Sequence, residues 1–419
     1  MVAMIKEPLS KIFETALETL GPLLAKREDA MFLKNRFTAL SYFKKYGMPS
    51  KQQDDWKYTD LSRYHFENFL TPPEPSHTSS LNKIHPLLID PLSTQQFISY
   101  NGYAIQTFKP AHFDIQTRPL SGVEDPPKNG LEALNRAFYM DTASIVIPRN
   151  CEVKEPIYLF HVIDSDQNTF MVQPKNWITL EENSQATLIE IYFSLGENPS
   201  FNNIVTEIRL AKNARLNHLF VQRSLTQNLQ IAHINVQQAE ASDYTTTALL
   251  LGGALNRTNF QIDLNQAHAH SQFYALALAN AKQQSDLHLC IRHNQPDCQS
   301  HTLTRGLVAD HARSAFTGKI VVQEGASRSQ ATLENKNLLL SSEAEVDTRP
   351  QLEIYNDDVQ CSHGATVGHL DLEALFYLKS RGIPEQEAKK LLIKAFMGPS
   401  LEGIPLPLRK AVEDLIDAH

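Results

Sequence analysis

Residues 204–236 read IVTEIRLAKNARLNHLFVQRSLTQNLQIAHINV, and this stretch decides the fold class. It contains three short runs in which apolar and polar residues alternate, at 204–210, 216–221 and 231–236. Polar segments rich in Asn, Gln and Ser separate the runs. An alternation with a period of two is typical of β-strands, because successive side chains of a strand point to opposite faces. The stretch therefore predicts consecutive strands joined by polar turns.

The same texture extends on both sides of this stretch, from 144 to 354. Further alternating runs lie at 157–163, 187–193, 260–264, 273–278, 319–322 and 352–355. Strands this regular suggest a sandwich, a propeller or a solenoid. The lack of a precise sequence repeat disfavours a propeller, whereas a β-helix tolerates weak repeats because each coil need only fill the interior with apolar side chains. The pattern favours a β-helix somewhat over a sandwich.

Helical spacing replaces the alternation at the N-terminal end. Apolar residues recur at helical intervals in two stretches: Ile12, Phe13, Ala16, Leu17 and Leu20, and then Leu33, Phe37, Leu40 and Phe43. We expect Gly21-Pro22 to stop the first helix, and Gly47 to follow the second. Three prolines between 71 and 80 indicate a linker.

Helical spacing also returns after Gly368, in three segments at 370–380, 384–398 and 404–418. The expected organisation is an N-terminal helical region and linker at 1–80, a connecting region at 81–143, a β-helix core at 144–369 and a C-terminal helical domain at 370–419. A cap that covers open sheet edges and a docking surface are both compatible with these last helices.

Charge and composition restrict the class of protein. The formal net charge of −8 argues against nucleic acid or an anionic membrane surface as the main partner. No uninterrupted apolar run approaches the roughly 18 residues that span a bilayer. Residues 1–30 carry acids and bases throughout, unlike a signal peptide, so a cytoplasmic location is expected. The four cysteines form no C-x-x-C pair and are expected to be free thiols in that reducing compartment.

Several enzyme motifs are missing from the sequence. Neither G-x-x-x-x-G-K-[ST] nor G-x-G-x-x-G occurs, so no intrinsic nucleotide site of either common type is expected. Neither G-x-S-x-G nor H-E-x-x-H is present. If the protein uses ATP, a partner has to supply the ATPase.

Two polar clusters could carry chemistry. The first comprises Asp286, His288, His293, Cys298 and His301 in a strand–turn–strand context. Five potential ligands in so short a span could hold a metal. Their spacing matches no defined zinc pattern, however, and turns between strands are commonly polar, so a structural role is favoured.

The second cluster lies at 357–368 and contains Cys361 and His363. In an extended segment these two side chains point to the same side, roughly 6.6 Å apart along the strand. A thiolate and a neutral imidazole so placed can share one iron or one edge of a cluster. A Cys–His nucleophilic pair is the alternative, but no recognisable oxyanion device accompanies it.

Ordered motifs along most of the chain resemble the SufB/SufD family. They are densest at 286–396: Asp286-x-His288, Pro296-Asp297-Cys298-Gln299-Ser300, Asn335-Lys336-Asn337, Pro350-Gln351-Leu352-Glu353-Ile354, Cys361-Ser362-His363-Gly364-Ala365-Thr366 and Phe376-Tyr377-Leu378. Asp55-Trp56-Lys57-Tyr58-Thr59 and Pro156-Ile157 are similar to further family landmarks. Two departures from SufB-type chains point to the SufD branch: Ala344 where they have a cysteine, and Cys361-Ser-His363-Gly where they have an acidic-His-acidic stretch.

The resemblance implies a mainly β fold, a right-handed parallel β-helix with α-helical segments at both ends. It implies a non-catalytic scaffold that pairs with a SufB-type paralogue through β-helix edges and docks a SufC-type ATPase on the C-terminal helices. A homodimer is a further expectation for the isolated chain. His363 corresponds to the family's interface histidine, which suggests that it helps to bind iron or a nascent iron–sulfur cluster; Cys361 beside it is a second candidate.

Two other functions remain open from the residues alone. A β-helix carbohydrate-active enzyme would need two carboxylates that flank a groove, and it would usually be secreted. The expected cytoplasmic location and the helical ends weigh against it. A stand-alone metalloprotein would instead use the cluster from Asp286 to His301.

Overall fold

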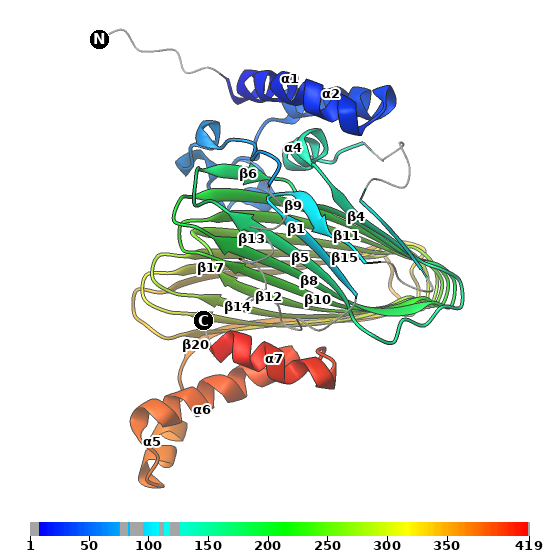
Figure 1. Cartoon of the computed structure of the whole chain (residues 1–419). Coiled ribbons are helices and arrows are strands. Elements are labelled where there is room, and N and C mark those ends of the chain that lie inside the picture. Colours follow the sequence, from blue (N-terminus) through cyan, green and yellow to red (C-terminus); the bar gives the residue numbers. More distant parts are fainter. Residues whose placement is uncertain (1–7, 76–82, 84–94, 109–112, 118–125, 418–419) are drawn as a thin grey trace.

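The structure of the protein is a computed structural model that describes residues 8–75, 83, 95–108, 113–117 and 126–417. Part of the predicted linker, residues 76–80, lies outside the described residues. Residues 81–82, 84–94, 109–112 and 118–125 of the expected connecting region also lie outside them. The strands form one long β-structure, and helices lie along two of its sides (Figure 1).

In the described part of the chain, the strands form two sheets of ten strands each. The first sheet contains β1 (Gln96–Tyr100), β2 (Tyr103–Gln106), β5 (Ile157–Asp164), β8 (Gln185–Leu195), β10 (Arg215–Ser224), β12 (Asp243–Gly252), β14 (His270–Ala279), β16 (Gln299–Val308), β18 (Ser329–Leu339) and β20 (Val359–His369). The second contains β3 (Asp114–Gln116), β4 (Thr142–Ile147), β6 (Phe170–Val172), β7 (Lys175–Leu180), β9 (Ser200–Leu210), β11 (Leu229–Gln238), β13 (Leu255–Leu264), β15 (Gln284–His293), β17 (Arg313–Val322) and β19 (Glu345–Ile354).

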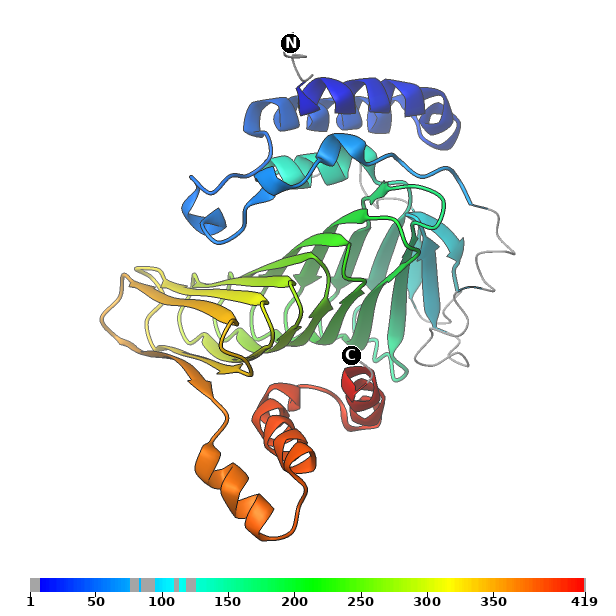
Figure 2. The ribbon, with the colours of Figure 1, turned by 90° about the vertical axis from the view of Figure 1, so that its left-hand side faces the viewer.

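From β9 onward the chain alternates between the two sheets, and each new strand pairs in parallel with the strand two positions earlier. Such a path is a parallel β-helix. Figure 2 shows its coils stacked side by side, with the last coil on the left. The predicted β-helix is therefore confirmed. Residues 204–236, with their three alternating runs, fall on β9, β10 and β11.

The alternation forms a β-helix because the register stacks like residues on each other. Ile234 of β11 pairs with Phe260 of β13, which pairs with Leu289 of β15, and all three are buried in the interior core. Each coil thus adds one apolar layer to a continuous core, and burial of each such side chain contributes about 1.5–3 kcal/mol.

The Asn-rich turns form the corners of the coils. Asn150, Asn183 and Asn213 adopt left-handed backbone conformations, which Asn tolerates better than most residues. Their side chains form a ladder, in which Asn213 donates to Asn183 and Asn183 donates to Asn150, each at 2.9 Å. The corner residues therefore stabilise one another from coil to coil.

The N-terminal helices cover the outer face of the second sheet. They are α1 (Leu9–Arg27), α2 (Ala30–Tyr46) and α4 (Gly130–Phe138), with 3-10 turns η1 (Asp54–Trp56), η2 (Leu61–Arg63) and η3 (Phe66–Asn68). Their apolar residues share one cluster with Phe201, Leu229, Ile231 and Leu255 of the sheet. The start of α4 lies so close to the end of α2 that a Cβ at Gly130 would be 1.8 Å from the carbonyl oxygen of Gly47.

The expected stop at Gly21-Pro22 is wrong, because α1 continues to Arg27 through Pro22. A proline inside a helix removes one hydrogen bond and restricts the preceding residue. Here that preceding residue is glycine, which has no Cβ to clash, and the buried Leu24 anchors the last turn in the core.

The C-terminal helices follow the first sheet, and their residues from Ile393 to Ile416 pack on its outer face. They are α5 (Leu372–Ser380), α6 (Glu385–Met397), the 3-10 turn η5 (Gly398–Leu401) and α7 (Leu406–Asp417), so helices form where they were predicted. Met397, Leu401, Ile404 and Val412 share an apolar cluster with outward-facing residues of many strands of this sheet. Figure 2 shows α6 and α7 returning from the last coil beneath the earlier coils.

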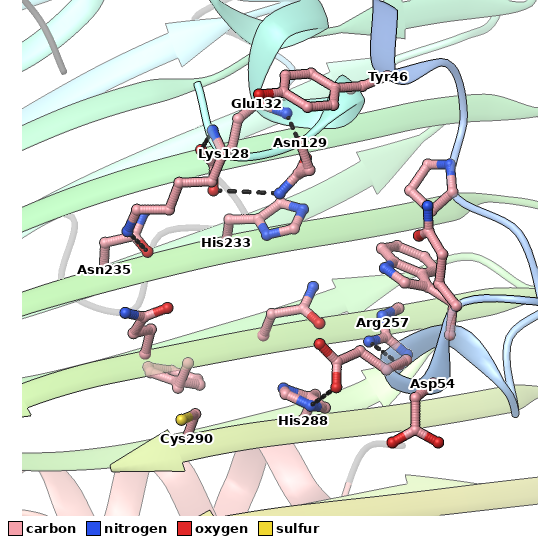
Figure 3. A pocket seen from close by; sticks show the side chains of 18 of the residues that line it. Tyr46, Asp54, Lys128, Asn129, Glu132, His233, Asn235, Arg257, His288 and Cys290 are labelled. Carbon is pink, nitrogen blue, oxygen red and sulfur yellow. Dashed lines mark hydrogen bonds and ion pairs between the residues drawn. The ribbon is translucent and has the colours of Figure 1, made fainter. Parts of the chain in front are cut away.

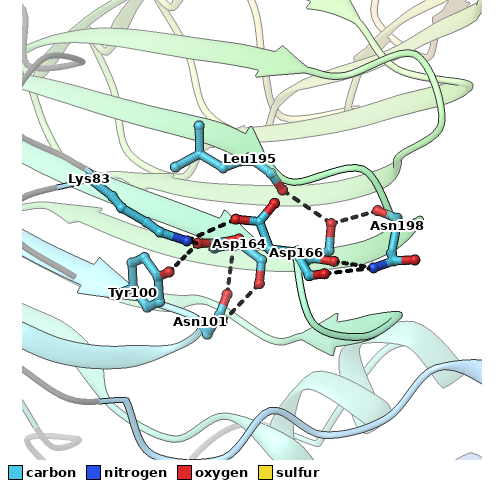
Figure 4. A network of polar contacts seen from close by, with 8 residues as sticks. Lys83, Tyr100, Asn101, Asp164, Asp166, Leu195 and Asn198 are labelled. Carbon is cyan, nitrogen blue, oxygen red and sulfur yellow. Dashed lines mark hydrogen bonds and ion pairs between the residues drawn. The ribbon is translucent and has the colours of Figure 1, made fainter. Parts of the chain in front are cut away.

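A polar network joins Lys83 to the first coil (Figure 4). The Lys83 ammonium contacts the buried carboxylate of Asp164, at the end of β5, and lies 2.8 Å from Asp166. The Tyr100 hydroxyl donates to Asp164, and the Asn101 amide exchanges two hydrogen bonds with the Asp164 backbone. The Asp164 charge is thus paired and hydrogen-bonded, as burial requires.

Candidate functional site

The last coil leaves the β-helix open at its C-terminal end. β19 and β20 are the terminal strands of their sheets; among the described strands, each pairs on one side alone. Every residue of these two strands is at least partly exposed, whereas most of β16 is buried. An edge of this kind presents unpaired backbone groups on which another strand can pair.

The interior of the β-helix also reaches this open end. Leu352 of β19 and Val359 and Cys361 of β20 pack on the interior core but are incompletely covered. Ile354 and Val367 on the same two strands are exposed. Exposed apolar residues gathered at an open strand edge are typical of a protein–protein contact.

Cys361 and His363 lie in this exposed strand, on the side that faces the interior. In the register of β20, Cys361 pairs with Ala331 and His363 with Leu333, and both partners are buried in the interior core. Cys361 is half-buried and His363 is exposed. The two side chains therefore share one side of an extended strand, as the sequence predicted.

The surroundings of Cys361 favour its protonated thiol. Burial raises its pKa, and a backbone hydrogen bond with Ala331 only partly opposes the shift. A cysteine binds metal as the thiolate, so a metal or a positive neighbour has to displace the proton.

In the described residues, no group of three or more His, Cys, Asp or Glu side chains is placed to hold a metal ion. Cys361 and His363 offer two ligands at most. Iron commonly has four or more ligands, and thiolates and imidazoles are suitable members of the set. A nascent cluster carried here as cargo would need its other ligands from a second chain or from sulfide.

The first predicted cluster, from Asp286 to His301, does not converge on a metal site. Asp286 is buried and pairs with Arg257; His293 is buried and lies 2.8 Å from the Ser300 hydroxyl; His301 is exposed and lies 2.7 Å from the Thr332 hydroxyl. Burial lowers the pKa of His293 to about 4, so its imidazole is neutral. Asp286 and His293 therefore have partners within the protein, in keeping with the structural interpretation, and the described residues of this cluster form no set of three metal-binding side chains.

Asp286 instead connects two sequence landmarks that are far apart in the chain. Its carboxylate accepts hydrogen bonds from Thr59 and from Arg257, and the Arg257 guanidinium stacks on Trp56 at 4.0 Å. The segment around Trp56 is thereby fixed to β13 and β15. Sequence reasoning missed Arg257, since no motif contains it and only the strand register brings it beside Asp286.

The C-terminal helices carry a second exposed surface. On α5 the side chains of Leu372, Phe376 and Tyr377 are exposed, Phe376 by 74%, and Leu391 of α6 is exposed as well. Phe396, by contrast, packs against the sheet beneath the Arg305 guanidinium. Apolar side chains that project from a helix hairpin without cover are candidates for a partner contact. No described helix is both long and apolar enough to cross a membrane.

Fold and site together define a β-helix protein whose last coil and whose α5–α6 hairpin present exposed apolar side chains. Comparison with known proteins agrees with this class. The SufBD core domain of the SUF system for FeS cluster assembly matches residues 161–396. An iron–sulfur cluster assembly SufBD family protein of Synechocystis is 33% identical, with 92% of this chain and 90% of that protein covered.

The iron–sulfur cluster assembly protein SufD of Escherichia coli is 30% identical, with coverage of 85% of this chain and 86% of that protein. SufD of Bacillus subtilis is 26% identical over 66% of this chain and 63% of that protein. The chain belongs to the SufBD family. It therefore has a role in SUF iron–sulfur cluster assembly, and the carbohydrate-active alternative is set aside.

Proposed function

We propose that the chain is the SufD-type scaffold subunit of a cytoplasmic iron–sulfur cluster assembly complex. It pairs with a SufB-type paralogue, docks a SufC-type ATPase and performs no catalysis itself. The observation that carries this proposal is the open last coil, where β19 and β20 have free edges and the apolar interior is exposed.

The open coil supports pairing with another β-helix. A second chain whose own last strands are unpaired could continue both sheets and cover Leu352, Ile354 and Val359 at once. Strand addition of this kind gains main-chain hydrogen bonds together with apolar burial. A second copy of this chain offers the same edge, which accounts for the expected homodimer in isolation.

The position of His363 supports a role in holding nascent iron or cluster at that junction. Its imidazole is exposed at the open end and Cys361 lies two residues away on the same side. A paired subunit would bring further ligands and would exclude water from the thiol and the imidazole. Cys361 is the weaker candidate of the two because its pKa is raised.

The exposed apolar face of α5 and α6 supports docking of the ATPase. Charged residues of both signs surround this apolar face: Lys379 and Lys389 pair with Glu385, while Lys390 of α6 has no ion pair in the described structure. ATP-driven movement of the partner can shift this chain only through a firm contact with it.

Anaerobic co-purification with SufB-type and SufC-type partners, followed by native mass spectrometry, tests the assembly. We expect one complex that contains this chain and both partners. Failure to bind either partner under reducing conditions would refute the scaffold proposal.

Reconstitution of that complex with ferrous iron and sulfide tests the site. In the His363→Ala complex we expect a reduced iron content with an unchanged subunit stoichiometry. His369→Ala is the matched control, because His369 is also exposed and lies on the same strand. Undiminished iron in the His363→Ala complex would remove His363 from the site.

A further inference from the structure

The interior of the β-helix changes from apolar to polar toward its open end. The register of the first sheet, from β12 to β18, stacks one inward row of Ala248, Ala275, Thr304 and Asn335. The neighbouring inward row contains Leu250, Ala277, Gly306 and Asn337. In both rows the residues of β12 and β14 are apolar and belong to the interior core, whereas those of β18 are asparagines. Polar side chains therefore gather beside the open coil that carries His363.

Asn335 and Asn337 form a network of hydrogen bonds that joins four strands. Asn335 donates to the Thr304 hydroxyl of β16 at 2.8 Å and accepts from the Thr348 hydroxyl of β19 at 2.8 Å. Asn337 donates to the side-chain oxygen of Asn335 at 2.6 Å and to the carbonyl oxygen of Thr366, on β20, at 3.3 Å. Because both asparagines lie on β18, the network connects the last coil to the two strands before it.

One backbone carbonyl fixes the direction of these hydrogen bonds. The Thr366 carbonyl can only accept, so the atom of Asn337 that faces it is the amide nitrogen. The Asn335 atom opposite that nitrogen must then be the oxygen, which leaves the Asn335 amide nitrogen to donate to Thr304. The Thr304 hydroxyl in turn donates to the carbonyl oxygen of Glu334 at 3.3 Å. A network whose donors and acceptors match in this way favours one arrangement of its strands.

Gly306 provides the space that the Asn337 amide occupies. A Cβ at position 306 would lie 2.3 Å from the side-chain oxygen of Asn337. The equivalent position of β14 is Ala277, so alanine is compatible with this row where no asparagine faces it. Asn335 is 2% exposed and Asn337 is 4% exposed, although the coil beyond them is open. The amides are thus fitted into the interior and do not serve as a solvated surface.

The last strand has few other restraints. In the described structure β20 pairs with β18 alone, and each of its residues is at least partly exposed. β19 has a further contact outside the β-helix, since Arg349 lies 2.8 Å from Asp54, which lines a polar cavity of about 490 Å³ between the second sheet and the N-terminal segments (Figure 3). Strands with few contacts open locally at little cost in free energy. A side-chain hydrogen bond to the backbone of β20 therefore matters more here than within the stack.

On the basis of the role of His363 stated above, we propose that Asn335 and Asn337 are positioning residues. They hold the two strands of the last coil in place, and with β20 the imidazole of His363. Asn335 pairs in the register with Ala365, two residues from His363 on the same inward side. A strand that is already fixed presents its imidazole and its free main-chain groups in one geometry, so a partner loses less affinity to the ordering of that strand.

Hydrogen exchange of the full chain, followed by mass spectrometry, tests whether the network holds β20. Gly306→Ala displaces the Asn337 amide but leaves every polar group of the network in the chain. We expect the amides of residues 359–369 to exchange about fivefold faster than in the wild type, the value of about one hydrogen bond. Gly325→Ala is the matched control, because a Cβ at that position meets nothing within 4 Å. Equal exchange of β20 in Gly306→Ala and in the wild type would overturn the proposal.

Two variants of Thr348 test the consequence for iron in the complex reconstituted with SufB-type and SufC-type partners. Thr348→Val keeps the shape of the side chain and removes the hydroxyl, whereas Thr348→Ser keeps the hydroxyl. We expect a partial loss of iron in the Thr348→Val complex, at an unchanged subunit stoichiometry, and the iron content of the wild type in the Thr348→Ser complex. Rescue by serine would identify the hydrogen bond, and not packing, as the cause. Equal iron contents in Thr348→Val and Thr348→Ser would overturn the positioning role of the network.

The exchange experiment also separates failure of this proposal from failure of the proposed function. It needs neither partner nor iron, so it decides whether the network holds β20 in every case. A wild-type complex that binds no iron would refute the site at His363 and leave the exchange result to decide on the network. Full iron in the Gly306→Ala complex, together with a loss of iron in the His363→Ala complex, would overturn the positioning role alone. Circular dichroism verifies that each variant is folded.

Discussion

Acidification from pH 7 to pH 5 should destabilise the β-helix through histidines that are buried as neutral rings. His161 is the clearest case. Its ring is 3% exposed, stacks on Tyr192 with 4.7 Å between the ring centroids, and lies 2.7 Å from the Ser99 hydroxyl. Burial lowers its pKa to about 4, and the negative charge of Glu190 opposes the shift only in part.

The sign and the size of the effect follow from proton linkage. The unfolded chain has a histidine pKa near 6.5, so between pH 6.5 and 4 it binds more protons than the folded chain, and stability rises with pH in this window. Above pH 6.5, protonation of His161 in the unfolded chain costs the folded state almost no stability. As the pH falls toward 4, this loss of stability grows. At pH 5 the loss amounts to about 2 kcal/mol for this one residue.

Urea denaturation at pH 7 and pH 5 measures this loss. The free energy of unfolding of the wild type should fall more than that of His161→Gln, by about 2 kcal/mol. His270→Gln is the matched control, because His270 is an exposed strand residue whose removal should leave the wild-type loss unchanged. If wild type and His161→Gln lose stability in parallel, the argument from burial is refuted.

Three further outcomes can be measured. Phe376→Ala should weaken binding of the SufC-type ATPase about tenfold in titration calorimetry, while Leu406→Ala on α7 should not; equal effects would exclude the α5 surface. Arg257→Met should lower the free energy of unfolding by about 3–5 kcal/mol, because Asp286 is left buried and unpaired, and adding Asp286→Leu should restore part of it; no recovery would contradict this pairing. Phe260→Ala should cost about 3–5 kcal/mol in urea denaturation, and a loss below about 1 kcal/mol would contradict a tightly packed interior.

The β-helix could be predicted because its core is built from a local pattern. Alternation at 204–236 identifies inward and outward residues before any partner strand is known, and the structure places these runs on three successive strands. The prediction that the first helix ends at Gly21-Pro22 was wrong for the opposite reason. Local propensity argued for a stop, but the packing of Leu24 in a distant cluster outweighed it.

The candidate site was only half visible in the sequence. The spacing of Cys361 and His363 determines that they share one side of a strand. Their place at an open end depends on the absence of a further coil over β20, which the described topology shows and the spacing does not. Arg257 was invisible for a related reason, since it comes beside Asp286 only through the register of two strands.

The return of the C-terminal helices beneath the first sheet has a mechanical consequence. In a β-helix each coil touches only its neighbours, so a force applied at one end would pass through every coil in series. The segment from η5 to α7 contacts several coils directly. Gly403, between these two helices, lies against Tyr274 and Thr247 of earlier coils, and Val412 of α7 shares a cluster with Ile189 and Leu219. A pull on α5 and α6 would therefore be distributed along the stack, and it would tilt the β-helix as one body instead of peeling off its last coil.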